Sequence, residues 1–64
     1  MTARKFQIDH AREIAAKLGE DVSIVDCTSD GIQSWQYVPA SETPPHAKTI
    51  GTATPAGEFH EGKY

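Results

Sequence analysis

The sequence predicts a small α+β fold, in which one N-terminal helix packs on an antiparallel sheet of three to four strands. Two β-prone runs flank an Asp-Gly turn in residues 22–38, an amphipathic helical pattern precedes them, and a β-branched segment follows a proline-rich loop. These three observations indicate consecutive strands that pair locally beneath a single helix. The length of 64 residues allows one domain, which we assign to residues 1–64.

The helix is expected from about His10 to Leu18. Its apolar residues recur at i, i+3, i+4 and i+7, the spacing of one helix face. These residues are Ala11, Ile14, Ala15 and Leu18. Asp9 is a suitable N-cap because its carboxylate accepts hydrogen bonds from the free N–H groups of the first turn. Gly19 is expected to end the helix in the left-handed conformation. Residues 5–8 are expected to form a short strand or a lead-in.

A β-hairpin is expected at the centre of the chain. Its strands are Val22–Thr28 and Ile32–Val38, and its turn is Ser29-Asp30-Gly31. Asp-Gly between β-prone runs is a strong hairpin signal because glycine takes a positive φ without steric cost. Side-chain alternation places Trp35 and Tyr37 on the same face of the second strand. There they either belong to the core or form a partly exposed aromatic patch for interaction.

The C-terminal part is expected to add one or two strands. Residues 39–47 form a breaker-rich loop, because its three prolines lack the N–H group that a strand ladder needs. Residues 48–54 are β-branched and predict a third strand, which a Pro-Ala-Gly turn follows. Residues 58–64 form either a fourth, edge strand with Phe59 as its packing residue or a frayed tail.

The charge distribution is uneven along the chain. The net charge is −3, and no Lys or Arg lies between Lys17 and Lys48. The same interval holds five acids, which are Glu20, Asp21, Asp26, Asp30 and Glu42. An acidic surface repels a nucleic-acid backbone and attracts basic partners, including proteins that themselves bind nucleic acid. The alternative is a solvated face that only keeps a small domain soluble.

The sequence contains no recognisable motif for catalysis or metal binding. The candidate metal donors are His10, Cys27, His46 and His60. Zinc ligands usually come as pairs two to four residues apart, which this spacing does not match. Cys27 follows Asp26, whose carboxylate disfavours a reactive thiolate, so we expect a small buried hydrophobe at this position. We therefore expect no enzyme activity, no cofactor and no metal.

The sequence favours a cytoplasmic protein. Its single cysteine suits a reducing compartment. No apolar run approaches the ~20 residues that a membrane span needs. Arg4 and Lys5 are not followed by the apolar block of a signal peptide.

One segment is similar to half of a helix-turn-helix motif. Residues 12–19, Arg-Glu-Ile-Ala-Ala-Lys-Leu-Gly, resemble the first helix and the turn. A recognition helix at Glu20–Asp30 would carry four acids and no Lys or Arg, so it would meet the phosphates with the wrong charge. A helix-turn-helix-like DNA-binding regulator therefore stays as an alternative function, beside an adaptor or antitoxin-type interaction protein.

In size, acidity and lack of catalytic motifs the whole chain resembles the small phage-encoded anti-CRISPR inhibitors. The resemblance implies a non-catalytic inhibitor that binds a Cas subunit of a type I surveillance complex and blocks target-DNA binding by DNA mimicry. On this interpretation the partner is a protein with a basic, nucleic-acid-binding surface. Neither nucleic acid nor membrane is contacted directly, and the inhibitor is expected to be a monomer.

The expected contacts follow from the chemistry of such a partner. Carboxylates at strand and turn positions can stand in for DNA phosphates against Lys and Arg side chains. Aromatic rings supply contact area that is desolvated on binding. The predicted partner-binding residues are Glu20, Asp21, Asp26, Asp30, Trp35 and Tyr37.

Overall fold

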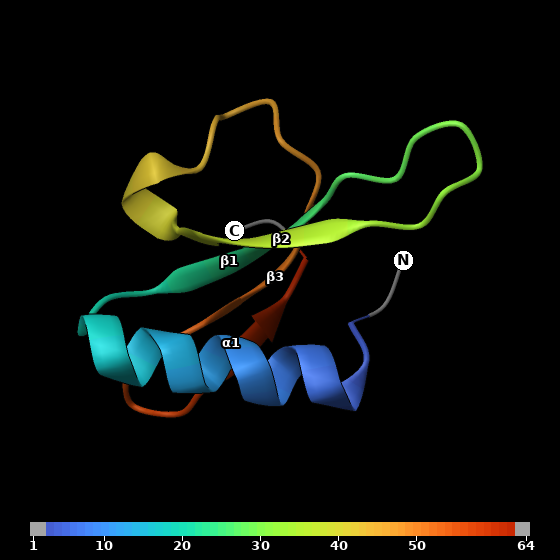
Figure 1. Cartoon of the computed structure of the whole chain (residues 1–64). Helices are drawn as coiled ribbons and strands as arrows, with labels where there is room; N and C mark the ends of the chain where they lie inside the picture. The colour runs from blue at the N-terminus through green and yellow to red at the C-terminus, as the bar shows by residue number, and fades with distance from the viewer. Residues whose placement is uncertain (1–2, 63–64) are drawn as a thin grey trace.

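One helix lies on one face of a four-stranded antiparallel sheet in the computed structural model, which describes residues 3–62 (Figure 1). This architecture confirms the predicted α+β fold. The elements in chain order are α1 (Lys5–Leu18), β1 (Val22–Asp26), β2 (Trp35–Pro39), the 3-10 helix η1 (Ala40–Glu42), β3 (Thr49–Ala53) and β4 (Phe59–Glu61).

The helix begins earlier than the sequence predicts. α1 starts at Lys5 rather than near His10, so the strand or lead-in expected for residues 5–8 is wrong. Asp9 is consequently not the N-cap. It is an exposed residue inside the helix, and its Oδ1 lies 3.8 Å from Nη1 of Arg12, one turn along.

Gln7 explains the early start. Its side-chain Oε1 accepts the backbone N–H of Arg4 at 2.8 Å, which satisfies one of the donors left free at a helix N-terminus. Gln7 is also buried, four residues before Ala11, and so continues the buried stripe by one turn with a polar side chain. A search for apolar periodicity misses such a residue. At the other end Gly19 caps the helix with φ 73°, as predicted.

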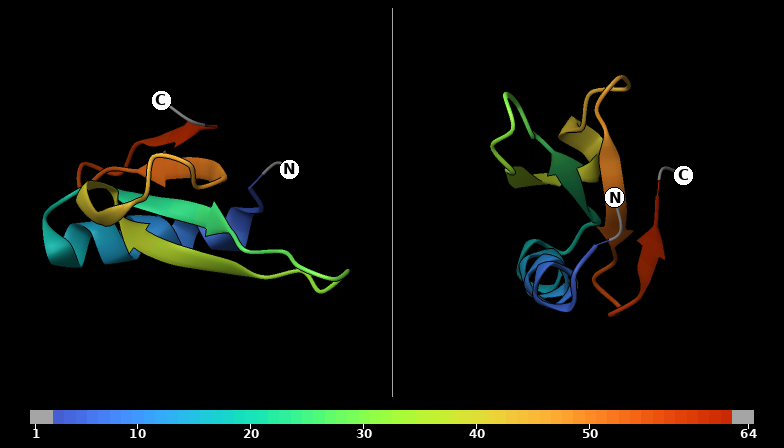
Figure 2. Two further views of the ribbon diagram at one scale, coloured as in Figure 1. Left: turned by 90° about the horizontal axis from the view of Figure 1, so that it is seen from above. Right: turned by 90° about the vertical axis from the view of Figure 1, so that its right-hand side faces the viewer.

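The strand order in the sheet is β2-β1-β3-β4, so β1 is central. Each neighbouring pair is antiparallel, which makes β2 and β3 parallel to each other. The connection between them, residues 40–48, therefore has to cross β1. It passes over the face of the sheet opposite α1 (Figures 1 and 2). Both faces of the central strand are covered as a result.

The core lies between α1 and the sheet. Its buried hydrophobic residues are Ala3, Ala11, Ala15, Val22, Ile24, Ile50 and Ala53. The small alanines let the helix lie close to the strands, and larger side chains such as Ile14 and Phe59 close the margins of the core. Gly51 is needed at the margin near β4, because a Cβ atom there would collide with the Phe59 ring and lie 2.9 Å from the His60 carbonyl oxygen. The glycine that interrupts the β-branched pattern of β3 thus makes room for an aromatic ring.

The face of the sheet opposite α1 is polar where the crossover covers it. Ser23 of β1 and Thr52 of β3 are only 4% and 2% exposed. Their hydroxyl oxygens lie 3.2 Å apart and share a hydrogen bond. Residues 40–48 cover this pair, and a polar contact rather than an apolar one joins the two central strands on this face.

The central hairpin has shorter strands than predicted. β1 ends at Asp26 and β2 begins at Trp35. Between them residues 27–34 form a narrow arm that projects beyond the helix and the sheet (Figure 2). We call residues 27–34 the hairpin arm. Cys27, expected to be buried, is exposed, because β1 ends before it and the arm has no layer packed on it.

The last strand is an edge strand. β4 spans Phe59–Glu61 and pairs with β3 through Gly51, Thr52 and Ala53. Of the two interpretations of residues 58–64, the edge strand holds for this stretch, while residues 63 and 64 lie outside the described part of the chain. The predicted Pro-Ala-Gly turn is present, with the Gly57 N–H donating to the Thr54 carbonyl at 3.0 Å.

Candidate partner-binding site

The four predicted acidic site residues fall at the two ends of β1 and do not form one patch. Glu20 and Asp21 precede the strand, whereas Asp26 ends it and Asp30 lies at the tip of the hairpin arm. At about 3.3 Å per strand residue, Asp21 and Asp26 are separated by roughly 16 Å. The structure therefore divides the expected acidic surface into two separate groups.

The first group is tied to the start of the crossover. Glu20 Oε1 accepts a hydrogen bond from the Ser41 hydroxyl at 3.0 Å. The Asp21 carbonyl accepts the Ala40 N–H at 2.9 Å. These contacts join the α1–β1 connection to η1, which gives both acids a structural role at that end of the sheet.

The second group stands at the base and the tip of the hairpin arm. Asp26 Oδ1 accepts the Thr28 N–H at 2.9 Å, the geometry of an Asx turn that starts the arm. Hydrogen bonds from the Thr28 side chain and backbone, with a smaller contribution from Lys48, lower the pKa of Asp26 below its ordinary value of 3.8. Asp26 is therefore charged at neutral pH.

The tip of the arm is a two-residue turn. Asp30 and Gly31 have φ values of 51° and 78°, and Ser29 and Ile32 exchange backbone hydrogen bonds of 3.1 and 2.9 Å on either side. Two positive φ angles are the signature of a type I′ turn, whose twist matches that of a hairpin. The predicted Asp-Gly turn is confirmed. It presents Asp30 close to Ile32, a residue that is 71% exposed.

Trp35 and Tyr37 belong to a half-buried aromatic cluster on the α1 side of β2. The Trp35 ring lies 5.6 Å from the ring of Phe6, and the Tyr37 ring stacks on His10 at 4.6 Å with an interplanar angle of 20°. Trp35 Nε1 also donates to the Tyr37 hydroxyl at 3.1 Å. Both interpretations of Trp35 and Tyr37 hold in part: they pack against the core margin and remain partly exposed.

Phe6 and His10 are members of this cluster that the sequence analysis did not select. Two helix residues four positions apart are separated by about 6 Å along the helix, and two strand residues two positions apart by about 6.6 Å along the strand. Such a pair on a helix can therefore contact such a pair on a strand, residue by residue. Phe6 and His10 have this helical spacing, as Trp35 and Tyr37 have the strand spacing. These equal separations could have predicted the contact between the two pairs, but only if the helix had been known to include residue 6.

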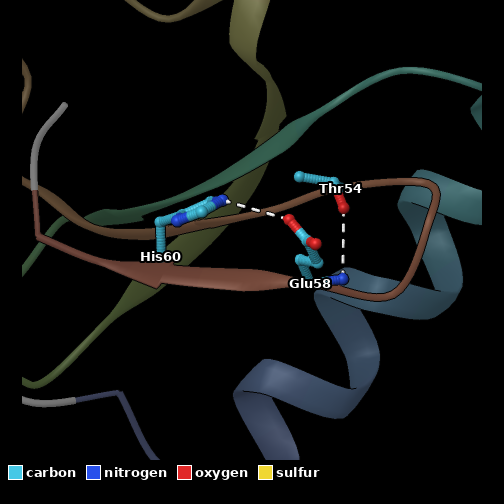
Figure 3. A network of polar contacts seen from close by, with 3 residues as sticks. All are labelled: Thr54, Glu58 and His60. Carbon is cyan, nitrogen blue, oxygen red and sulfur yellow. Dashed lines mark hydrogen bonds and ion pairs between the residues drawn. The ribbon is translucent and has the colours of Figure 1, made fainter.

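A smaller polar network lies at the opposite edge of the sheet (Figure 3). The Glu58 N–H donates to the Thr54 hydroxyl at 3.1 Å, and His60 Nε2 lies 3.7 Å from Glu58 Oε2. Glu58 and His60 are exposed and Thr54 is half-buried, and the contacts stabilise the turn before β4. Among residues 3–62 no group of three or more His, Cys, Asp or Glu side chains is arranged to hold a metal ion.

A hollow of about 190 Å³ lies between the crossover and the sheet. Its lining combines hydroxyl and apolar groups from Ser23, Ala40, Thr43, Pro44, Pro45, Thr49 and Thr52. It is smaller than the ~300 Å³ at which small-molecule pockets begin, and no titratable side chain contributes to its lining.

No helix in the described part of the chain is both long and apolar enough to cross a membrane. No family model, curated protein or solved structure matches the chain.

Proposed function

We propose that the protein is a non-catalytic inhibitor that binds a partner protein through the hairpin arm. The observation that carries the proposal is the arm itself. It projects from the domain with all of residues 27–34 exposed, and it carries Asp30 at its tip and Asp26 at its base (Figure 2). Residues 27–34 contain no Lys or Arg, so the arm itself has no cation beside Asp30, and Lys48 acts only on Asp26 at the base.

A narrow acidic arm is suited to a basic groove. A protein channel that holds nucleic acid is lined by Lys and Arg, and carboxylates pair with these side chains as phosphates do. Ile32, exposed next to the Asp30-Gly31 turn, adds apolar contact area at the tip of the arm. Glu20 and Asp21 are outside this proposed contact, because they lie at the far end of β1.

The resemblance to anti-CRISPR inhibitors supports a Cas subunit of a type I surveillance complex as the partner. Insertion of the arm into the path of the target DNA would exclude the DNA without any chemical step. The alternative of a helix-turn-helix regulator loses its basis, since Glu20–Asp30 contains β1 and the start of the arm instead of a recognition helix.

A DNA gel shift tests the proposal. Guide-loaded type I surveillance complex and labelled target DNA are run with and without the protein, beside a lane of the protein and DNA alone. We expect the shift of the complex to disappear as the protein is added, with no shift in the lane without the complex. A shift by the protein alone, or an undiminished shift of the complex, would contradict the proposal.

Matched variants test the role of the arm. Asp26→Asn with Asp30→Asn removes two charges, keeps an oxygen that can accept the Thr28 N–H, and keeps a residue type that tolerates a positive φ at position 30. Glu58→Gln with Glu61→Gln removes two charges at the opposite edge. We expect only the arm variant to need about tenfold or more protein for inhibition. Equal loss in both variants would indicate that net charge alone matters.

A further inference from the structure

The outer edge of β2 is an unpaired strand edge without charge. β2 is at the end of the described sheet, so its second side has no neighbouring strand there. Residues 33–40, Gln-Ser-Trp-Gln-Tyr-Val-Pro-Ala, contain no charged side chain. Soluble proteins usually protect such an edge with charges, because its free backbone groups form a template for another strand.

The hydrogen bonds to β1 identify which backbone groups face outward. The Cys27 N–H donates to the Ser34 carbonyl and the Ala40 N–H to the Asp21 carbonyl. Because the bonded positions of an antiparallel pair alternate, the even-numbered residues of β2 face β1. The N–H and C=O groups of Trp35 and Tyr37 therefore point away from the sheet.

The two ends of the edge are blocked, which limits the register of any added strand. Pro39 has no N–H, and its carbonyl already accepts the Thr43 hydroxyl at 3.1 Å. Before Trp35 the chain leaves the sheet and enters the hairpin arm. The free edge is thus confined to Trp35 and Tyr37, with Gln36 at its centre.

We propose that this edge pairs with the same edge of a second copy of the chain. An antiparallel pairing about a two-fold axis at Gln36 places Trp35 opposite Tyr37 of the second copy, and Tyr37 opposite Trp35. In this single register, the outward N–H and C=O groups of Trp35 and Tyr37 in each chain are all hydrogen-bonded to the other chain. The two sheets then join into one continuous sheet.

The surroundings of the edge favour a second copy as the occupant. The edge is self-complementary, so two identical strands satisfy each other completely. α1 contacts one face of β2 through Phe6 and His10, while the outer edge of β2 has no neighbouring strand in the described sheet. Pairing would cover the rings of Trp35 and Tyr37 and approach Phe6, which is 52% exposed. Because the edge carries no charged side chain, two copies of this acidic protein can pair there without repulsion between like charges in the contact. The proposed dimer is an alternative to the monomer expected from the sequence.

Gln36 offers a direct test, because the two-fold axis places it opposite itself. Its side chain is exposed, so substitution leaves the core intact. Gln36→Glu and Gln36→Lys would each place like charges on two directly opposite residues, whose Cα atoms are about 4.5 Å apart in such a pair. We expect the unsubstituted protein to dimerise, and each variant alone to have a dissociation constant raised about fivefold or more. An equimolar mixture of the two variants should recover dimers.

Sedimentation equilibrium measures the association, and native mass spectrometry with one variant isotopically labelled identifies the mixed dimer. Ala56→Glu and Ala56→Lys, in the exposed turn between β3 and β4, are controls that should dimerise normally. A monomeric unsubstituted protein at millimolar concentration would overturn the proposal. Unchanged dimers of both Gln36 variants, or a mixture that stays monomeric, would also overturn it. The result is independent of the arm-charge experiment, so either proposal can fail alone.

Discussion

Asp26 has two roles that compete in any substitution experiment. Its carboxylate starts the hairpin arm by accepting the Thr28 N–H, and its charge belongs to the surface proposed for partner binding. A change to lysine would remove the turn and reverse the charge together. The neutral amide separates the two roles, because asparagine retains an acceptor oxygen without the charge.

The lowered pKa of Asp26 predicts a pH-dependent contribution to stability. Because hydrogen bonds from Thr28 hold the folded-state pKa below 3.8, the ionised carboxylate stabilises the fold above that pH. This contribution is lost as the pH falls through the folded pKa. We expect the unsubstituted protein to have a higher urea midpoint than Asp26→Asn at pH 7, and this difference to shrink as the pH falls below 3.8. A difference that stays constant from pH 7 to pH 2 would contradict this assignment.

At the scale of an element, α1 is held at its N-terminus by one side chain. Gln7 caps the Arg4 N–H and fills a buried position on the sheet. Exposed pairs on the same helix are weaker: Lys17 and Glu13 approach to 3.3 Å, but both side chains are more than half exposed. The buried Gln7 contact therefore determines where the helix begins, whereas solvent screens the exposed Lys17–Glu13 ion pair.

Substitution of Gln7 should shorten the helix. Gln7→Ala leaves the Arg4 N–H without its acceptor and opens a gap at the core margin, which costs roughly 1–3 kcal/mol of unfolding free energy. Urea denaturation measures the loss, and hydrogen exchange should rise in residues 5–8. Lys17→Ala is the matched control and should change stability by less than about 1 kcal/mol. Similar costs for the two variants would show that Gln7 has no special role.

At the scale of the whole molecule, the sheet is covered differently on its two faces. α1 covers one face and packs small apolar side chains against it. The crossover of residues 40–48 covers the other face, where the hydroxyl groups of Ser23 and Thr52 share a hydrogen bond (Figure 1). Ser23 and Thr52 are 29 residues apart in the sequence but lie on neighbouring strands. Their hydrogen bond therefore exists only in the assembled sheet.

The hydroxyl pair predicts a non-additive response to mutation. Ser23→Ala or Thr52→Val alone leaves one buried hydroxyl without its partner and should cost about 1–3 kcal/mol. The double substitution removes both groups, and its cost should be clearly smaller than the sum of the single costs. A double-mutant cycle from urea denaturation measures this coupling. Additive costs would mean that each hydroxyl acts independently.

Several elements were predictable because their signals are local. The Asp30-Gly31 turn, the Gly19 cap and the third strand each depend on the conformational preference of a few adjacent residues. The start of α1 was not predictable in this way. It depends on the burial of Gln7 against a sheet that forms later in the chain, and a polar residue does not register in an apolar pattern.

The candidate site shows the same division. By itself, the sequence determined the fold class, the exposed Asp-Gly turn, the long interval without a cation, and the shared face of Trp35 and Tyr37, because composition and residue alternation depend on neighbours along the chain. Only the tertiary structure decided that Glu20 and Asp21 are separated from Asp26 and Asp30, and that Phe6 and His10 meet the two aromatic residues. The reason is physical: strand length and helix register set these distances, and packing across the sheet determines both.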